Sequence, residues 1–267
     1  MENKSNKLSK LFLIFVFIIM YLPLAYLIFY SFNSGGNMNS FESFTLEHYQ
    51  AVFSDKRLLN IVLNTIILAL LSSLIASIVG TLGAISIYYT KNKKIKKQLL
   101  SLNSVLMVLP DIMMGASFLI LFSILLKIPM GFFSVLLAHI AFSIPIVVLM
   151  VLPRLYALNE DMIRAAEDLG ASDMMILNKI ILPNIASGIF AGFFMALTYS
   201  LDDFAVTFFV TGSGFSTLSI EIYSRVRSGI SLEINALSAI IFAISLVMVI
   251  IYYIIERRET KKYEQGL

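Results

Sequence analysis

Three aspartates lie in otherwise apolar stretches of this sequence and are the first candidates for chemistry: Asp111, Asp202 and Asp203. A charged side chain at the centre of a bilayer costs about 2.5–3.5 kcal/mol on insertion scales, so each carboxylate calls for a compensating partner. No Lys or Arg lies in the same stretches away from their ends. A cationic substrate in a water-filled path is therefore one candidate partner.

The surroundings of these acids leave their roles open. Asp202 and Asp203 are consecutive and point about 100° apart on a helix, so we do not expect them to share one ligand group. Tyr199 lies about one turn earlier and offers a hydroxyl or a cation–π face. Either aspartate can instead contact a second membrane subunit. Asp111 follows a proline at an expected helix break, where it can alternatively cap the resumed helix.

Two further residues are candidates by position. Tyr223 lies in the segment 212–233, which either lines the outer mouth of a pathway or forms a solvated loop. His139 stands alone in an apolar stretch, where we expect a hydrogen-bonded core residue rather than a ligand. The sequence contains 0 Cys, so it has no thiolate metal site and no cysteine nucleophile. We expect no metal site and no catalytic residue.

The composition identifies the elements that must position these residues. The chain has 267 residues, of which 58% are hydrophobic and 14% charged, and its mean hydropathy is +0.87. Soluble domains are about 45–50% apolar and about 25% charged. A water-soluble globule and a disordered chain are therefore excluded, and a polytopic membrane protein remains.

Six stretches are long enough to cross a bilayer core, which needs about 20 apolar residues in a helix. We therefore predict an all-α membrane protein with six transmembrane helices in a single domain, 11–256, between cytoplasmic ends at 1–10 and 257–267. The first stretch is too long for the apolar region of a signal peptide and is predicted to be retained. The predicted spans are 11–32, 60–90, 99–126, 131–152, 184–210 and 234–256.

Basic residues give the expected orientation. Fifteen of the 20 Lys and Arg residues lie at the two ends and in the second and fourth loops, and five lie on the other side. Because basic loops stay inside, both termini are predicted to be cytoplasmic. The basic run 93–97 is expected to face anionic lipid rather than nucleic acid.

The fourth loop, 153–183, has the local chemistry of a short helical hairpin. Asn159 is placed to cap a first helix, and Gly170 to end it in a left-handed conformation. Ser172 is placed to cap a second helix, which the Leu182-Pro183 pair is expected to end because proline cannot continue a helical ladder. An amphipathic helix lying on the membrane is the alternative.

This loop resembles the EAA loop of ABC-importer permeases. The family pattern is Glu-Ala-Ala, three residues, Gly, nine residues and Ile-x-Leu-Pro. The sequence matches it from Ala165-Ala166 through Gly170 to Ile180-Ile181-Leu182-Pro183, with Arg164 at the position of the family's Glu. Glu167 lies one turn further along the same helix face, which indicates that the acidic position is exchanged rather than lost. The resemblance implies that the hairpin docks on an ATPase through the residues Arg164, Ala165, Ala166, Glu167, Gly170, Ile180, Leu182 and Pro183.

Further motifs resemble the C-type permease subunits of spermidine/putrescine importers. They are the segment 44–49, the pair Asp202-Asp203, the segment 209–212 and the segment 235–237. The resemblance implies a polyamine permease that works by alternating access in the bacterial cytoplasmic membrane. The implied partners are a second, different permease subunit, two ATP-binding cassette subunits and an extracytoplasmic polyamine-binding protein. The implied substrate pathway includes Asp111, Tyr199, Asp202, Asp203 and Tyr223.

The chain is not expected to be an enzyme. It lacks a G-x-x-x-x-G-K-[ST] phosphate loop, so it is expected to bind no cofactor, while the partner ATPase uses ATP and Mg²⁺. Three alternatives stay open. They are a permease for a metal cation or another amine, an intramembrane aspartyl protease built on Asp111 and Asp202, and a proton-coupled carrier, since intramembrane acids often relay protons.

Overall fold

The computed structural model describes residues 2–228 and 232–264. In these ranges the regular structure is helical, and extended residues pair only at an isolated antiparallel bridge between Asn33 and Phe44. The expected all-α fold is confirmed. The chain forms two compact units, which are described separately: one contains the two ends of the chain, up to Leu59 and from Ile222, and the other runs from Asn60 to Glu221.

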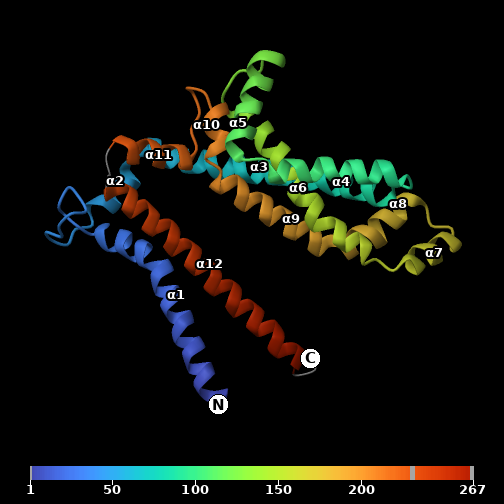
Figure 1. Ribbon diagram of the computed structural model, residues 1–267, viewed down its shortest axis with the longest axis horizontal. Coiled ribbons are helices and arrows are strands. Elements are labelled where there is room, and N and C mark those ends of the chain that lie inside the picture. Colours follow the sequence, from blue (N-terminus) through green and yellow to red (C-terminus); the bar gives the residue numbers. More distant parts are fainter. Residues whose placement is uncertain (1, 229–231, 265–267) are drawn as a thin grey trace. The chain divides into compact units, whose positions relative to one another are not determined.

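The unit made by the chain ends is built on α12, which lies against α1 and α2 (Figure 1). A loop after α1 is held by the buried Asn33, whose side-chain amide donates to the carbonyls of Asn37 at 2.9 Å and Ser40 at 2.8 Å. The helices are α1 (Glu2–Tyr30), α2 (Glu47–Ser54), the first turn of α3 (Lys56–Tyr89), the end of α11 (Leu218–Ser228) and α12 (Leu232–Glu264).

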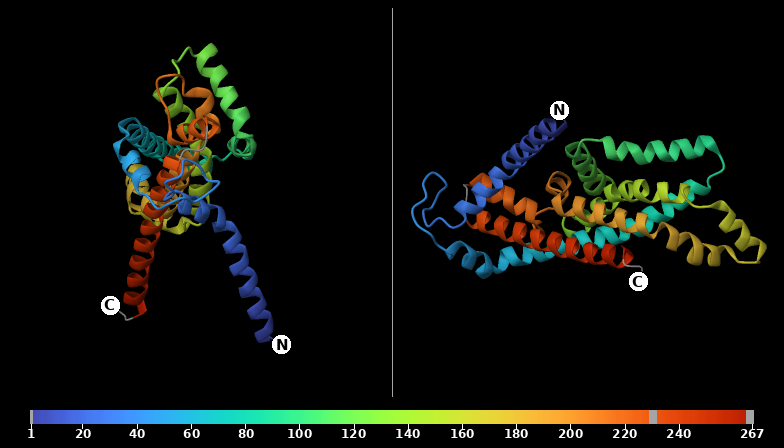
Figure 2. Two further views of the ribbon diagram at one scale, coloured as in Figure 1. Left: turned by 90° about the vertical axis from the view of Figure 1, so that its left-hand side faces the viewer. Right: turned by 90° about the horizontal axis from the view of Figure 1, so that it is seen from below.

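The central unit, 60–221, carries most of the predicted site residues. Its α6 lies along α9, and its α5 lies along α10 (Figures 1 and 2). Besides most of α3, its elements are α4 (Lys93–Val108), α5 (Asp111–Ile120) with the π-helical η1 (Leu121–Leu125), α6 (Phe132–Tyr156), α7 (Glu160–Asp168), α8 (Asp173–Ile176) with the π-helical η2 (Leu177–Ile181), α9 (Leu182–Asp202) and α10 (Ala205–Val210).

Small residues allow α9 to approach α6 closely. Gly188, Gly192 and Ala196 recur every four residues on the buried face of α9. A Cβ atom added at Gly192 would lie 3.1 Å from Cα of Val147, and one at Gly188 would lie 2.9 Å from the carbonyl oxygen of Met150. Membrane helices pack through such small residues because apolar burial gains little in lipid. At this contact, which we call the glycine seam, the distance between α6 and α9 is therefore set by backbone atoms.

The predicted spans correspond to helices of the structure. In the described residues four helices are long and apolar enough to cross a membrane: Ser9–Tyr30, Lys56–Tyr89, Phe132–Tyr156 and Asp173–Asp202. A fifth span results if the bent pair Lys93–Val108 and Asp111–Leu125 counts as one. The sixth predicted stretch falls within α12, of which 232–247 forms a shorter apolar helix in the described part.

Two predicted spans are interrupted. The third bends by 106° between Val108 and Asp111, at Pro110, which cannot donate a helical hydrogen bond. This matches the break expected there. The fifth was predicted as one run, 184–210, and that is wrong: α9 stops at Asp202, and the separate helix α10 begins at Ala205.

The expectation that Leu182-Pro183 ends a helix is also wrong. The helical run continues from Asp173 through Pro183 to Asp202. The π turn η2 ends at Ile181, two residues before Pro183, and a wider turn makes room for the ring. The side-chain amide of Asn184 donates to the carbonyl of Ile180 at 2.7 Å. The hairpin is thus continuous with a membrane-spanning helix.

Candidate functional site

The hairpin of α7 and α8 has the capping chemistry that the sequence predicts. The side chain of Asn159 accepts from the backbone N–H of Asp161 at 2.9 Å and starts α7. Gly170 follows α7 with a φ of +75°, a left-handed conformation that glycine adopts without strain. The hydroxyl of Ser172 accepts from the N–H of Met175 at 3.4 Å and starts α8. These predictions are confirmed.

The residues of the EAA-like motif are largely available to a partner. Ala165, Glu167 and Gly170 are exposed, and Ala166 is half-buried against the core of the unit. Apolar side chains accompany them on the surface: Leu169 is 88% exposed and Met174 is 64% exposed. A short hairpin that exposes acidic side chains together with apolar ones has the chemistry of a protein-docking surface.

Arg164 pairs within its own helix. Its guanidinium lies 3.0 Å from Oε2 of Glu160 and 4.0 Å from Oδ1 of Asp161. Exposed pairs of this kind contribute about 0.3–0.5 kcal/mol, so they orient the side chain more than they stabilise the fold. Glu167 stays exposed on the next turn. The first turn of α7 therefore supplies the acids that Arg164 contacts.

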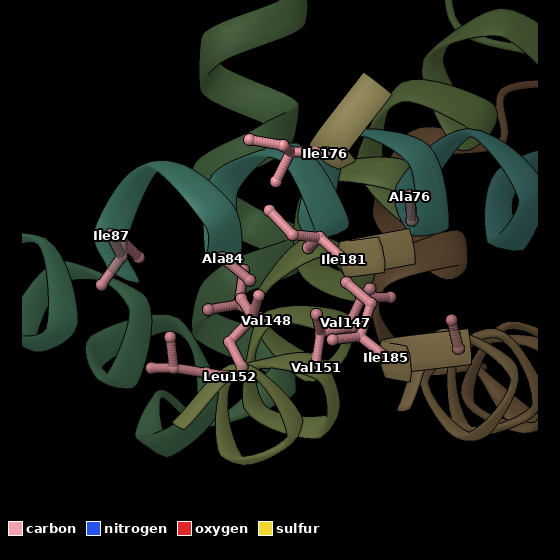
Figure 3. Close-up of a cluster of buried hydrophobic side chains, with 12 residues drawn as sticks. Ala76, Ala84, Ile87, Val147, Val148, Val151, Leu152, Ile176, Ile181 and Ile185 are labelled. Atoms are coloured by element: carbon pink, nitrogen blue, oxygen red, sulfur yellow. The ribbon is translucent and has the colours of Figure 1, made fainter. Parts of the chain in front are cut away.

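The base of the hairpin is fixed in a buried apolar cluster. Ile176, Ile181 and Ile185 pack with Val147 and Val151 of α6 (Figure 3). The predicted docking residues at this end are less accessible than those of α7: Ile180 and Leu182 are half-buried, whereas Pro183 is exposed. A hairpin anchored this way transmits a force on its tip to α6 and α9, because packed interiors do not deform freely.

Asp111 and Tyr199 meet in the central unit. The Tyr199 hydroxyl donates to Oδ1 of Asp111 at 3.4 Å, and both side chains are exposed. Asp111 is the first residue of α5, while Pro110 occupies the capping position. Asp202, the last residue of α9, is also exposed. A carboxylate is costly in lipid, so an exposed face of this kind suits contact with another subunit or with water.

Asp203 differs from its neighbour, because its carboxylate has partners inside the chain. Its side chain is 5% exposed, and Oδ2 accepts from the backbone N–H of Thr207 at 2.8 Å and from the Thr207 hydroxyl at 2.7 Å. Oδ1 accepts from the N–H of Val206 at 3.3 Å. The carboxylate of Asp203 therefore has hydrogen-bond donors within the chain and anchors the start of α10.

His139 is a buried, hydrogen-bonded core residue, as expected. Nδ1 lies 2.6 Å from Oγ of Ser200, and Nε2 lies 2.9 Å from Oγ1 of Thr207 and 3.5 Å from Oδ2 of Asp203. Neither Ser200 nor Thr207 was predicted as a partner of His139. Ser200 lies four residues after Ala196 on the buried face of α9, and this spacing was an available signal. Thr207 lies on α10, beyond the interruption at Asp203, so helical spacing could not place it.

Tyr223 lies on α11 in the unit of the chain ends, where it is 42% exposed. Two residues further along α11, Arg225 holds this unit together: it donates to Oδ2 of Asp55 at 2.8 Å and to Oε2 of Glu233 at 2.9 Å. The N–H of Leu58 donates to Asp55, and this bond together with Arg225 lowers the pKa of the Asp55 carboxyl.

The sequence of this chain matches a known protein family. The profile of the family described as "Binding-protein-dependent transport system inner membrane component" matches residues 80–261. The chain is 38% identical to the spermidine/putrescine transport system permease protein PotC of Escherichia coli (strain K12), over 94% of each chain. It is 34% identical to PotC of Haemophilus influenzae, over 94% of this chain and 97% of that one. It is 30% identical to the putrescine permease PotI of Escherichia coli, over 92% and 90%.

Solved structures share the fold. A bacterial ABC transporter that imports the acidic polysaccharide alginate superposes with a TM-score of 0.74 at 18% identity, over 96% of this chain and 97% of that chain. The MetNI methionine ABC transporter superposes with a TM-score of 0.61 at 17% identity, over 73% and 91%. These likenesses concern the arrangement of helices alone.

Proposed function

Because this chain belongs to the family of binding-protein-dependent transport system inner membrane components, we propose that it is the permease subunit of an ATP-driven importer that carries polyamines such as spermidine and putrescine. The similarity to spermidine/putrescine permeases along nearly the whole chain carries this proposal. The family places the protein in the inner membrane. We further propose that both termini face the cytoplasm, in keeping with the distribution of basic residues.

The exposed face with Asp111, Tyr199 and Asp202 has the chemistry to contact a polyamine on its way through the membrane. Carboxylates pair with ammonium groups, and a tyrosine ring attracts a cation over its face. A polyamine carries at least two ammonium groups, so separate acids on one path suit it better than a single site. We propose that these three residues line the substrate path, and that Tyr223 lies toward its outer mouth.

The hairpin of α7 and α8 is the proposed docking element for an ATP-binding cassette subunit. ATP binding favours one state of the ATPase pair, and a hairpin rooted in a packed cluster passes that movement to α6 and α9. Arg164, Ala165, Glu167 and Gly170 form the accessible part of this surface. The ATPase subunit binds ATP and Mg²⁺, while this chain forms part of the substrate path and changes conformation.

The complete importer, as proposed, contains a second and different permease subunit, two ATPase subunits and an extracytoplasmic polyamine-binding protein. Mild detergent extraction followed by mass spectrometry tests this composition. We expect the ATPase and the second permease to co-purify with this chain. Recovery of this chain with neither partner, under conditions that keep other importers intact, would contradict the proposal.

Substitution of the acids tests the substrate. In cells that depend on imported spermidine, Asp111→Asn and Asp202→Asn should lower the rate of uptake about tenfold, because each removes one charge–charge contact of about 1.5–3 kcal/mol. Assembly with the ATPase should be unchanged. Unchanged uptake kinetics in both variants would remove these residues from the path.

A further inference from the structure

A chain of buried polar side chains connects three membrane helices to the start of α10. Ser72 of α3 lies 3.0 Å from Ser200 of α9, which lies 2.6 Å from Nδ1 of His139 on α6. Nε2 of His139 lies 2.9 Å from the hydroxyl of Thr207, which lies 2.7 Å from Oδ2 of Asp203. All of these residues belong to the central unit.

The donors in this chain can be assigned from the groups present. An ionised carboxylate only accepts, so Thr207 donates its hydroxyl hydrogen to Asp203. The Thr207 oxygen must then accept from His139, which places a hydrogen on Nε2. Nδ1 is left as the acceptor for the hydroxyl of Ser200. The single hydroxyl hydrogen of Ser72 is within reach of both Ser200 and the carbonyl of Ala69. This tautomer satisfies the contacts of both ring nitrogens to Ser200 and Thr207, and a buried network of this kind fixes a unique arrangement.

The network ends at the interruption between α9 and α10. Asp203 has an extended backbone, with a φ of −63° and a ψ of 122°, and its carboxylate accepts from the N–H groups of Val206 and Thr207. The buried members of the network alternate along the chain with exposed residues: Ser200 follows Tyr199, and Asp203 follows Asp202. Because Ser200 and Asp203 are held on the buried side, their neighbours Tyr199 and Asp202 point to the exposed side.

A ring contact links the same histidine to the exposed face by a second route. The rings of His139 and Phe142 are 4.9 Å apart, and those of Phe142 and Tyr199 are 5.4 Å apart. The Tyr199 hydroxyl in turn contacts Asp111. His139 thus touches both the helix end that carries Asp202 and the aromatic side chain beneath Tyr199.

We infer that His139 is a positioning residue: through Thr207 and Asp203 it fixes the end of α9, so that Tyr199 and Asp202 face the substrate path while Asp203 does not contact substrate. This inference rests on the proposed function for its substrate. It gives the two consecutive aspartates different roles, one in the path and one in the structure. It also assigns a role in transport to a histidine that never meets the polyamine.

Two conservative variants separate the halves of the network. His139→Gln offers an N–H near the position of Nε2 and keeps the contact to Thr207, whereas His139→Asn reaches only as far as Ser200. In the full importer we expect His139→Asn and His139→Leu to raise the KM for spermidine uptake about tenfold, and His139→Gln to stay within about threefold of wild type. Loss of folded protein alone would lower Vmax and leave KM unchanged.

The second histidine of the chain provides the matched control. His48 contacts the carbonyl of Asn33 in the other unit at 2.8 Å, and His48→Leu should leave KM at the wild-type value. Equal KM values for His139→Gln and His139→Asn, or a wild-type KM in His139→Leu, would overturn the inference.

Amide hydrogen exchange tests the positioning without reference to substrate. In the assembled importer, the N–H groups of Val206 and Thr207 should exchange at least about tenfold faster in His139→Leu than in wild type, because Asp203 no longer holds them. If these exchange rates are the same in His139→Leu and wild type, the inference is refuted, even when the wild-type importer takes up polyamine normally. A wild-type importer that takes up no polyamine would refute the proposed function instead, and the exchange rates would then decide the role of His139 in holding α10.

Discussion

Asp111 and Tyr199 are 88 residues apart in the sequence, yet one hydrogen bond joins them on an exposed face of the central unit. Both residues could be identified from the sequence, Asp111 as a carboxylate in an apolar stretch and Tyr199 because it lies one turn before two further acids. Their contact was not predictable, since it depends on how α5 turns away from α4 at Pro110. The acid at position 203 shows the opposite case: its charge was evident, but its partner His139 lies 64 positions away on another helix.

The contact between Tyr199 and Asp111 gives a prediction for a single hydroxyl. Tyr199→Phe keeps the ring against Phe142 and removes the donor to Asp111. A hydrogen bond of about 1 kcal/mol corresponds to about a fivefold change, so the KM for spermidine uptake should rise by that factor. Phe133, an exposed phenylalanine of α6, offers a control in Phe133→Tyr, which should leave KM unchanged. A wild-type KM in Tyr199→Phe would show that the hydroxyl plays no part in binding.

Asp55 gives a prediction for pH. Its pKa lies below the ordinary value of 3.8 in the folded protein, chiefly through the N–H of Leu58 and then through Arg225. A lowered folded-state pKa contributes stability above the unfolded-state pKa, and this contribution is lost as the pH falls through the folded-state value. Thermal unfolding of the purified protein should therefore show a drop in Tm below about pH 4. Asp55→Asn should have a lower Tm at neutral pH and a smaller drop; an identical profile would contradict the role of Asp55.

At the scale of elements, the hairpin of α7 and α8 shows how far local chemistry predicts structure. Asn159, Gly170 and Ser172 lie where their capping preferences place them. The end of the second helix was mispredicted, because the effect of Pro183 depends on a π turn that packing against α6 stabilises. Caps are local interactions, while the path of a helix through a proline depends on its neighbours.

Gly170 tests the docking of the hairpin. A Cβ atom added there would meet none of the surrounding atoms within 4 Å, but the φ of +75° costs an L-residue about 1–2 kcal/mol. Gly170→Leu should therefore insert in the membrane and lower the uptake per ATP hydrolysed by about tenfold, because the side chain projects into the proposed ATPase contact. Gly214→Leu is the matched control, since Gly214 is also in open space and has no positive φ. Normal coupling in Gly170→Leu would count against docking at this turn.

The glycine seam of α9 tests the packing between α6 and α9. A Cβ at position 192 would lie 3.1 Å from the Val147 backbone, so Gly192→Leu should destabilise the protein by about 1–3 kcal/mol or more. Ala191 is the exposed neighbour on the same helix, and Ala191→Leu should leave the Tm within experimental error. Equal Tm values for the two variants in detergent would mean that α6 and α9 can move apart at the glycine seam without loss of stability.

At the scale of the whole molecule, composition alone determined the class of protein. A chain that is 58% hydrophobic needs a membrane, and its apolar stretches correspond to the long helices of the structure. The interruption at Pro110 was predictable, because proline cannot donate a helical hydrogen bond. The interruption at Asp203 was not, because this residue interacts with His139 of another helix. The chain has no G-x-x-x-x-G-K-[ST] phosphate loop, and our proposal assigns the energy for transport to a separate ATPase that binds the hairpin.

Uptake of spermidine into proteoliposomes is the most direct test of this account. Vesicles would hold this chain with its second permease and two ATPase subunits, the polyamine-binding protein would be added outside, and ATP would be enclosed or omitted. We expect spermidine to accumulate only when ATP, the ATPase and this chain are all present. Accumulation driven by this chain without the ATPase, or no accumulation by the complete complex, would contradict the central claim that this protein is a polyamine path moved by a separate motor.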